Sequence, residues 1–181
     1  MNVIAGSLKG RKLNFVKNKN VRPLTQKVKE AMFSVLQDWI VEKNILDLFC
    51  GSGSMAIEAI SRGASHADLV DLSVGMAVQN VKALGIEEYA DIFRKDVLLA
   101  LKLIHSKEKS YDFIFVGAPY GFPKTGKVLE TIDEHRVLRK GGYLMLERPN
   151  HREFPSEFES FAEKKQYRYG QTVIVLYESI L

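Results

Sequence analysis

The chain has 181 residues, of which 46% are hydrophobic and 27% charged, a balance typical of one globular domain with a buried core. Its single cysteine, Cys50, excludes an intrachain disulfide, and nothing indicates an oxidising compartment. No apolar run approaches the roughly 20 residues of a membrane span, and the N-terminus lacks the apolar core of a signal peptide. These features exclude a membrane-spanning protein and predict a cytoplasmic one.

The net charge of +4 is unevenly placed along the chain. Residues 1–40 contain eight lysines and arginines but two acidic residues, Glu30 and Asp38, whereas acidic residues slightly outnumber basic ones elsewhere. Basic charge gathered at one end is typical of proteins that bind nucleic acid. A basic segment that is merely solvated is the alternative interpretation.

The first 40 residues are interpreted as a basic extension, and residues 41–181 as the main domain. Two short alternating segments, Asn2–Ala5 and Lys12–Val16, flank a glycine-containing connection and predict a hairpin. Pro23 disfavours helix just before it, and Thr25 is the predicted N-cap of a helix to about Ile40. The apolar face expected to dock on the main domain consists of Val28, Met32, Val35, Leu36 and Trp39.

From residue 44 onward, strand-like apolar segments alternate with amphipathic helical ones, which predicts a mainly parallel sheet with helices on both faces. The expected strands are Ile45–Phe49, Ala67–Asp71, Ala90–Phe93, Phe113–Val116, Tyr143–Glu147, Lys164–Tyr169 and Thr172–Glu178. The expected helices are Ser54–Arg62, Val74–Leu84, Val97–His105, Lys127–Val137 and a short one near Ser156–Phe161. Because only Gly170 and Gln171 separate the last two strands, these should form an antiparallel hairpin. The fold class is therefore α/β, with a Rossmann-like, seven-stranded sheet.

The chain is organised around the turn that joins the first of these strands to the first of these helices. Gly51, Gly53 and Ala56 fit the pattern of nucleotide-binding turns, in which glycines give backbone freedom and let a ligand come close. The helix N-terminus also aims free N–H groups at the ligand. Asp47 precedes the turn and favours a ligand with a cation, such as S-adenosylmethionine, over a dinucleotide. Cys50 is interpreted as a small residue that fills the turn.

Ligands of such sheets bind above the carboxyl ends of the strands, so the residues there are the site candidates. Asp71 ends the second strand and can hold ribose hydroxyls, and Asp96 follows the third strand and can accept from adenine. Either acid taken alone is more typical of a helix cap or a solvated charge. Tyr120 and Phe122 follow the fourth strand and can stack on a flipped-out base, or can merely close the core. The four histidines are scattered without ligand spacing, and no metal is expected.

Several segments resemble those of one known family over nearly the whole chain. They are Val3–Gly6 with Lys9–Leu13, Arg22–Phe33 with its Arg-Pro-Leu-Thr start, Asp47–Gly53, and Tyr169–Thr172. Together they resemble the RsmD-type 16S ribosomal RNA guanine-N2 methyltransferases, which are class I S-adenosylmethionine-dependent enzymes. The glycine turn alone identifies the superfamily, whereas the N-terminal segments point to this family.

The resemblance implies S-adenosyl-L-methionine as cofactor and the 16S rRNA of the small ribosomal subunit as partner; a monomer is the default expectation. The Asp47 turn would hold the methionine end, Asp71 the ribose and Asp96 the adenine. The implied cofactor-binding residues are Asp47, Phe49, Gly51, Gly53, Asp71, Leu72, Asp96 and Val97. The implied RNA-binding residues are Lys9, Arg11, Lys12, Arg22, Thr25 and Lys27. Tyr120 would stack on the target guanine.

This chain departs from the family at the fourth strand. Where the family has Asp-Pro-Pro-Tyr, the catalytic positions here are Gly117, Ala118, Pro119 and Tyr120. The missing carboxylate is the group that accepts from the guanine amine and aims its lone pair at the methyl group. Asp112 lies five residues earlier, roughly 16 Å away at about 3.3 Å per residue, and cannot replace it.

Four functions are consistent with these residues. The first is an active rRNA guanine-N2 methyltransferase. The second is an RNA- or ribosome-binding protein on the same scaffold whose chemistry is impaired by Gly117. The third is a methyltransferase acting on another substrate, which the basic extension disfavours. The fourth is a nicotinamide enzyme, which Asp47 disfavours.

Overall fold

The computed structural model describes residues 1–15 and 26–181. These residues contain one seven-stranded sheet with the order β3-β2-β1-β4-β5-β7-β6. Its strands are β1 (Asn44–Leu48), β2 (His66–Asp71), β3 (Ala90–Arg94), β4 (Tyr111–Val116), β5 (Leu138–Pro149), β6 (Phe161–Tyr169) and β7 (Thr172–Ser179). The predicted fold class and all seven predicted strands are confirmed, with ends that differ by a few residues.

Strands β1 to β5 pair in parallel, and β7 runs antiparallel between β5 and β6. The predicted terminal hairpin is therefore present. The strand order reverses between β1 and β4, which lie side by side. In sheets of this kind, the crevice above the carboxyl ends at such a reversal is the usual place for a ligand.

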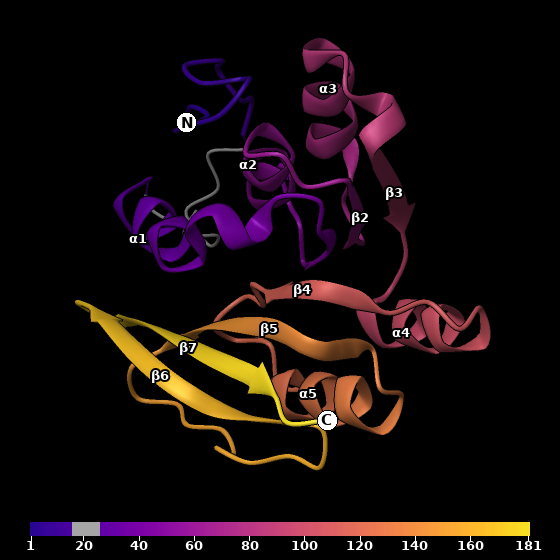
Figure 1. The fold of residues 1–181 in the computed structure, drawn as a ribbon, viewed down its shortest axis with the longest axis vertical. Coiled ribbons are helices and arrows are strands. Elements are labelled where there is room, and N and C mark those ends of the chain that lie inside the picture. The colour runs from indigo at the N-terminus through magenta and orange to yellow at the C-terminus, as the bar shows by residue number, and fades with distance from the viewer. Residues whose placement is uncertain (16–25) are drawn as a thin grey trace.

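Helices cover both faces of the sheet (Figure 1). One face carries α1 (Gln26–Leu36), η1 (Gln37–Ile40), α2 (Ser54–Ser61) and α3 (Gly75–Leu84). The other face carries α4 (Val97–Ser106) and α5 (Thr125–Glu134), and a short 3₁₀ turn, η2 (Glu87–Tyr89), precedes β3. The apolar side chains of the central strands alternate between the two core layers, as expected for a sheet buried on both sides. None of the described helices is long and apolar enough to cross a membrane.

The short helix predicted near Ser156–Phe161 is wrong. Residues 155–160, all of which are described, form a loop, and Phe161 already belongs to β6. The three-residue spacing of Phe158 and Phe161 imitates a helical face, but both rings instead pack around Tyr177. The ring centroids of Phe158 and Phe161 lie 6.0 and 5.5 Å from that of Tyr177. Aromatic packing of a loop residue and a β6 residue against Tyr177 of β7 therefore determines the conformation of this segment.

The predicted helix of the extension is present, but its inner face is rotated from the prediction. Val35 is exposed, while Lys29 and Phe33 are buried beside Val28 and Met32. The α-helix ends at Leu36, and a 3₁₀ turn, which starts at Gln37 with φ +44°, then redirects the chain. The predicted N-cap, Thr25, lies outside the described residues.

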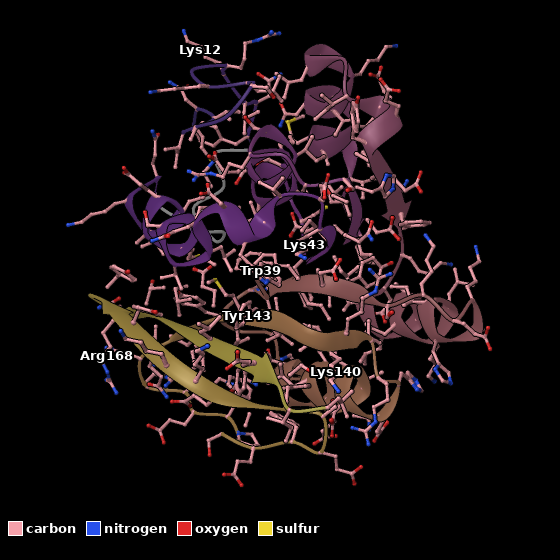
Figure 2. All side chains as sticks on the ribbon, in the orientation of Figure 1. Lys12, Trp39, Lys43, Lys140, Tyr143 and Arg168 are labelled. Atoms are coloured by element: carbon pink, nitrogen blue, oxygen red, sulfur yellow. The ribbon has the colours of Figure 1, made fainter. Side chains whose placement is uncertain are left out.

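Trp39, in this 3₁₀ turn, packs edge-on against Tyr143 of β5, with ring centroids 4.8 Å apart (Figure 2). The contact seats the C-terminal end of the extension on the sheet. The predicted hairpin before it is an isolated antiparallel bridge between Asn2 and Lys12, closed by a bond from the Val3 N–H to the Arg11 carbonyl. Val16, at the predicted end of this hairpin, lies outside the described residues.

Candidate cofactor and RNA site

The turn between β1 and α2 has three residues with left-handed backbone, Phe49 at φ +64°, Gly51 at +53° and Gly53 at +76°. Glycine adopts this conformation freely, whereas Phe49 is strained by about 1–2 kcal/mol. A Cβ on Gly53 would lie 2.9 Å from Leu69 Cδ2, but a Cβ on Gly51 would meet no described atom within 4 Å. Gly53 is therefore required by packing, and Gly51 leaves open space above the turn.

Asp47, at the carboxyl end of β1, is 1% exposed. Its Oδ2 accepts a hydrogen bond from the Ala56 N–H at 3.1 Å, which satisfies a free donor in the first turn of α2. Its Oδ1 is buried without a hydrogen-bond partner among the described residues. Burial raises the pKa of Asp47 to about 7, and the negative charge of Asp71 adds to this effect. One oxygen thus supports the turn, and the other is left to an external donor.

Asp71, at the end of β2, lies beside the glycine turn as predicted from the sheet. Its Oδ2 accepts from the Gly51 N–H and its Oδ1 from the Ser73 N–H, each at 2.9 Å. The side chain is half-buried, and each carboxylate oxygen keeps a second lone pair for a ligand hydroxyl. The arrangement is compatible with the expected grip on ribose, which stays a prediction.

Asn80 of α3 holds the turn from the other side, and sequence reasoning missed it. This side chain is 2% exposed. Its Nδ2 donates to the carbonyls of Ser52 and Asn14, both at 2.9 Å, and its Oδ1 accepts from the Asn14 N–H at 2.8 Å. One amide therefore joins the glycine turn to the N-terminal segment.

Asp96 is the N-cap of α4, because its Oδ1 accepts from the N–H groups of Leu98 at 2.9 Å and Leu99 at 3.2 Å. The structure thus gives Asp96 the helix-cap role that the sequence left open, and its contact with adenine stays a prediction. Leu72, after β2, is exposed, while Val97, the first residue of α4, is buried in the core. Of these two expected cofactor contacts, Leu72 offers an apolar surface to a ligand.

The end of β4 lies directly beside the glycine turn, since the Gly117 N–H donates to the Leu48 carbonyl at 3.2 Å. A Cβ on Gly117 would lie 2.7 Å from Cε1 of the Phe115 ring. The ring edge therefore occupies the place where an aspartate side chain would begin. Ala118 is buried and Pro119 exposed.

Tyr120 is half-buried and is anchored by its hydroxyl, which donates to Glu147 Oε1 at 3.2 Å and lies 2.6 Å from Thr172 Oγ1. The Phe122 ring, by contrast, is not available beside Tyr120 for stacking on a base. It packs edge-on against Phe49, with centroids 5.1 Å apart, over the core. For Phe122 the core-closing alternative holds, whereas stacking by Tyr120 on a base stays a prediction.

Comparison with known proteins decides the family. Residues 1–178 match the model of the family described as Conserved hypothetical protein 95. A Bacillus subtilis protein named as a candidate rRNA methyltransferase, YlbH, is 34% identical over 98% of both chains. Ribosomal RNA small subunit methyltransferase D of Escherichia coli strain K12 is 31% identical over 78% of this chain and 68% of its own. The chain belongs to the RsmD-type methyltransferase family.

Solved structures share the fold of this chain. An Escherichia coli protein described as a candidate methyltransferase, yhhF, superposes with a TM-score of 0.85 at 22% identity, over 99% of this chain and 97% of its own. An RNA methyltransferase of Salinibacter ruber in complex with S-adenosyl-L-homocysteine has a TM-score of 0.64 at 15% identity, over 87% and 93% of the two chains. These structures confirm the fold predicted from the sequence, as the family model and the relatives confirm the predicted family.

The residues of this RsmD-type chain fit S-adenosyl-L-methionine, the cofactor that the sequence predicts. The open space above Gly51 admits a ligand close to the backbone of the turn. The unpartnered Oδ1 of buried Asp47 suits a cation, such as the ammonium group of the methionine end, or a water held by it. Asp71 and the exposed Leu72 would then face the ribose and adenine.

The basic surface of the RsmD-type extension is partly described. Four of the six expected RNA-binding residues are described and exposed, namely Lys9, Arg11, Lys12 and Lys27. Arg11 Nη2 also donates to the Ala83 carbonyl of α3 at 3.3 Å. Figure 2 shows Lys12 reaching away from the body of the molecule, as does Arg168 in β6. The remaining two, Arg22 and Thr25, lie outside the described residues.

One histidine has a charged environment that the sequence did not indicate. His66 Nε2, at the amino end of β2, lies 3.2 Å from Asp91 Oδ2 and 3.4 Å from Asp68 Oδ1. The buried Asp68 also accepts from Lys109 Nζ at 2.9 Å and from the Tyr111 hydroxyl. The cluster joins β2, β3 and β4 at the end of the sheet opposite the glycine turn.

Proposed function

We propose that this protein transfers a methyl group to the exocyclic N2 amine of a guanine in the 16S rRNA of the small ribosomal subunit. The support at the level of rRNA methylation comes from relatives named as ribosomal RNA small subunit methyltransferases. The observation that carries the proposal is the hydrogen bond from the Gly117 N–H to the Leu48 carbonyl, which supports a position for Pro119 and Tyr120 beside the glycine turn. A base stacked on Tyr120 would lie beside the cofactor site.

S-adenosyl-L-methionine supplies a methyl group on a positively charged sulfur. An exocyclic guanine amine is a poor nucleophile, because its lone pair is delocalised into the ring. The protein must therefore orient the amine and stabilise the charge that develops on it. In our proposal Tyr120, fixed by its hydroxyl to Glu147 and Thr172, holds the plane of the base. Asp47 and Asp71 hold the cofactor, and Lys9, Arg11 and Lys12 contact RNA phosphates.

The test is transfer of labelled methyl to small ribosomal subunits that lack the modification, with naked 16S rRNA in parallel. Nucleoside analysis of the product by mass spectrometry should give N2-methylguanosine. A different methylated nucleoside would refute the guanine-N2 assignment. Cofactor and RNA binding without transfer would instead favour the binding protein on the same scaffold.

A matched variant tests the basic surface. Replacing Lys9, Arg11 and Lys12 together with glutamine removes three exposed charges without touching the glycine turn. Binding of RNA should weaken similarly for all RNA sequences, and the slope of its salt dependence should fall by about 2–3. Cofactor affinity should stay unchanged. An unchanged salt slope would place the RNA surface elsewhere.

A further inference from the structure

The register of β4 and β5 places a carboxylate beside the position that lacks one. Phe115 pairs with Met145 and Val116 with Leu146, so the next residues along the two strands are Gly117 and Glu147. Phe115 and Met145 both point into the core layer on the side of α1 to α3. Because side chains alternate along a strand, positions 117 and 147 face the same side, and neighbouring strands lie about 4.8 Å apart.

Glu147 is tied to the loop that follows Gly117. The Tyr120 hydroxyl links two side chains by hydrogen bonds: it lies 2.6 Å from Thr172 Oγ1 and donates to Glu147 Oε1 at 3.2 Å. Thr172 is buried in β7, and Glu147 is half-buried at the carboxyl end of β5. The carboxylate is therefore held at the ligand-binding edge of the sheet, against the residue expected to stack on the base.

We propose that Glu147 is the catalytic carboxylate of this protein and supplies the group that Gly117 lacks. This inference rests on the proposed guanine-N2 methyl transfer. Glutamate is one methylene longer than aspartate, which suits a carboxylate that starts one strand further from β1. The Phe115 ring, packed where a side chain at 117 would begin, closes the original position.

In this assignment Glu147 accepts a hydrogen bond from the guanine N2 amine and aims its lone pair. The bond from N2 to the methyl carbon forms as the sulfur–carbon bond breaks, and the electron pair of the broken bond stays on sulfur. N2 then loses one proton, which passes to the Glu147 carboxylate and from there to water. The Glu147 carboxylate must be ionised before the step, so the rate should fall at acid pH.

Glu147→Gln is the decisive variant, because glutamine keeps the size of the side chain and an oxygen that accepts from Tyr120. The single-turnover rate should fall at least 100-fold, in the range typical of a lost proton acceptor. With S-adenosyl-L-methionine saturating at every pH, so that protonation of Asp47 does not limit cofactor binding, the acid limb of the pH–rate profile should disappear. The dissociation constants of cofactor and RNA should change by less than about threefold, which is less than the loss of one typical hydrogen bond would cause. Glu147→Asp should retain more activity than Glu147→Gln.

Thr172→Val is the matched control, since it alters the anchor of Tyr120 but leaves the carboxylate. It should lower the rate less than Glu147→Gln and keep the acid limb. A Glu147→Gln rate within about threefold of native, with the acid limb kept, would overturn the role of Glu147 while leaving the proposed function intact. If the native chain transfers no methyl where a family member with the aspartate does, the proposed function fails, and the role of Glu147 with it.

Discussion

Lys29 Nζ lies 3.3 Å from Glu58 Oε2, and both side chains are fully buried. Glu58 also accepts from the N–H groups of Ile4 at 2.8 Å and Ala5 at 3.0 Å, and from Arg62 Nε at 2.9 Å. One carboxylate of α2 therefore joins the N-terminal segment and α1 to the helix that follows the glycine turn. Burial lowers the pKa of Lys29, and the neighbouring Glu58 opposes this shift.

Replacing Glu58 should destabilise the protein more than replacing Lys29. Glu58→Ala strands a buried lysine and two backbone N–H groups, so we expect a loss of about 3–5 kcal/mol in the free energy of unfolding. Lys29→Met leaves Glu58 with Arg62 and both backbone donors, and its loss should be smaller. Urea unfolding measures both. Lys27→Met, an exposed change on the same helix, is the control and should stay within about 0.5 kcal/mol. Equal losses for Lys29→Met and Glu58→Ala would contradict this account.

Asp47 should make the protein without cofactor less stable as pH rises. The folded-state pKa of about 7 lies above the ordinary value of 3.8, so between these pH values the folded chain holds a proton that the unfolded chain has released. The free energy of unfolding therefore falls between about pH 4 and 7 and is constant above that range. This residue contributes at most about 4 kcal/mol to the fall. Asp47→Asn should remove that part of the slope in unfolding experiments at pH 5 and 8.

The same carboxylate should make cofactor binding depend on pH in the opposite direction. A cationic group near Oδ1 favours ionised Asp47, so native affinity should rise by up to about tenfold per pH unit between pH 5 and 7. Asp47→Asn should bind more weakly at pH 8 and lose most of this dependence. Isothermal titration with S-adenosyl-L-methionine checks both. A variant with native affinity at pH 8 would show that Asp47 supports only the turn.

The two glycines of the turn should respond differently to alanine. Gly53→Ala places a methyl group 2.9 Å from Leu69 and 3.4 Å from Ala77, in addition to the strain of a positive φ, and we expect a loss of about 2–4 kcal/mol in stability. Gly51→Ala meets only the strain, about 1–2 kcal/mol, but fills the space left for the ligand. Thermal unfolding should separate the variants, and cofactor affinity should fall for Gly51→Ala. Similar stability losses would mean that the Leu69 contact relaxes easily.

The fold was predictable from sequence because strand and helix periodicities are clear along most of residues 44–181, the exception being residues 156–161, where the spacing of Phe158 and Phe161 imitates a helix. The glycine turn followed from the spacing of Gly51, Gly53 and Ala56, and Asp71 from the rule that ligands bind above strand ends. The same rule applies to Glu147, which ends the predicted fifth strand, but a lone acid at a strand end does not indicate which residue of the neighbouring loop it contacts. Asn80 and Glu58 were missed because a polar residue in an amphipathic helix gives no sign of burial. Their partners lie 66 and 54 residues away, at Asn14 and Ile4, and long-range pairing of this kind has no local signal.

Introducing an aspartate at position 117, where the resemblance implies one in the family, should require a second change. Gly117→Asp alone drives its Cβ to 2.7 Å from Phe115 Cε1, so we expect a loss of about 1–3 kcal/mol from overpacking and little gain in activity. Gly117→Ala should show the same loss without a charge. In Gly117→Asp with Phe115→Leu, the smaller side chain should relieve the contact and admit the carboxylate.

The double variant becomes informative when Glu147 is also changed to glutamine. If a carboxylate at either position can serve the amine, Gly117→Asp with Phe115→Leu should recover at least tenfold of the methyl-transfer rate lost in Glu147→Gln, because the proton acceptor returns one strand away. Phe115→Leu with Glu147→Gln is the control and should recover nothing. Single-turnover methyl transfer and urea unfolding are measured on the same samples. A stable triple variant without recovery would mean that position 117 is no longer oriented toward the base.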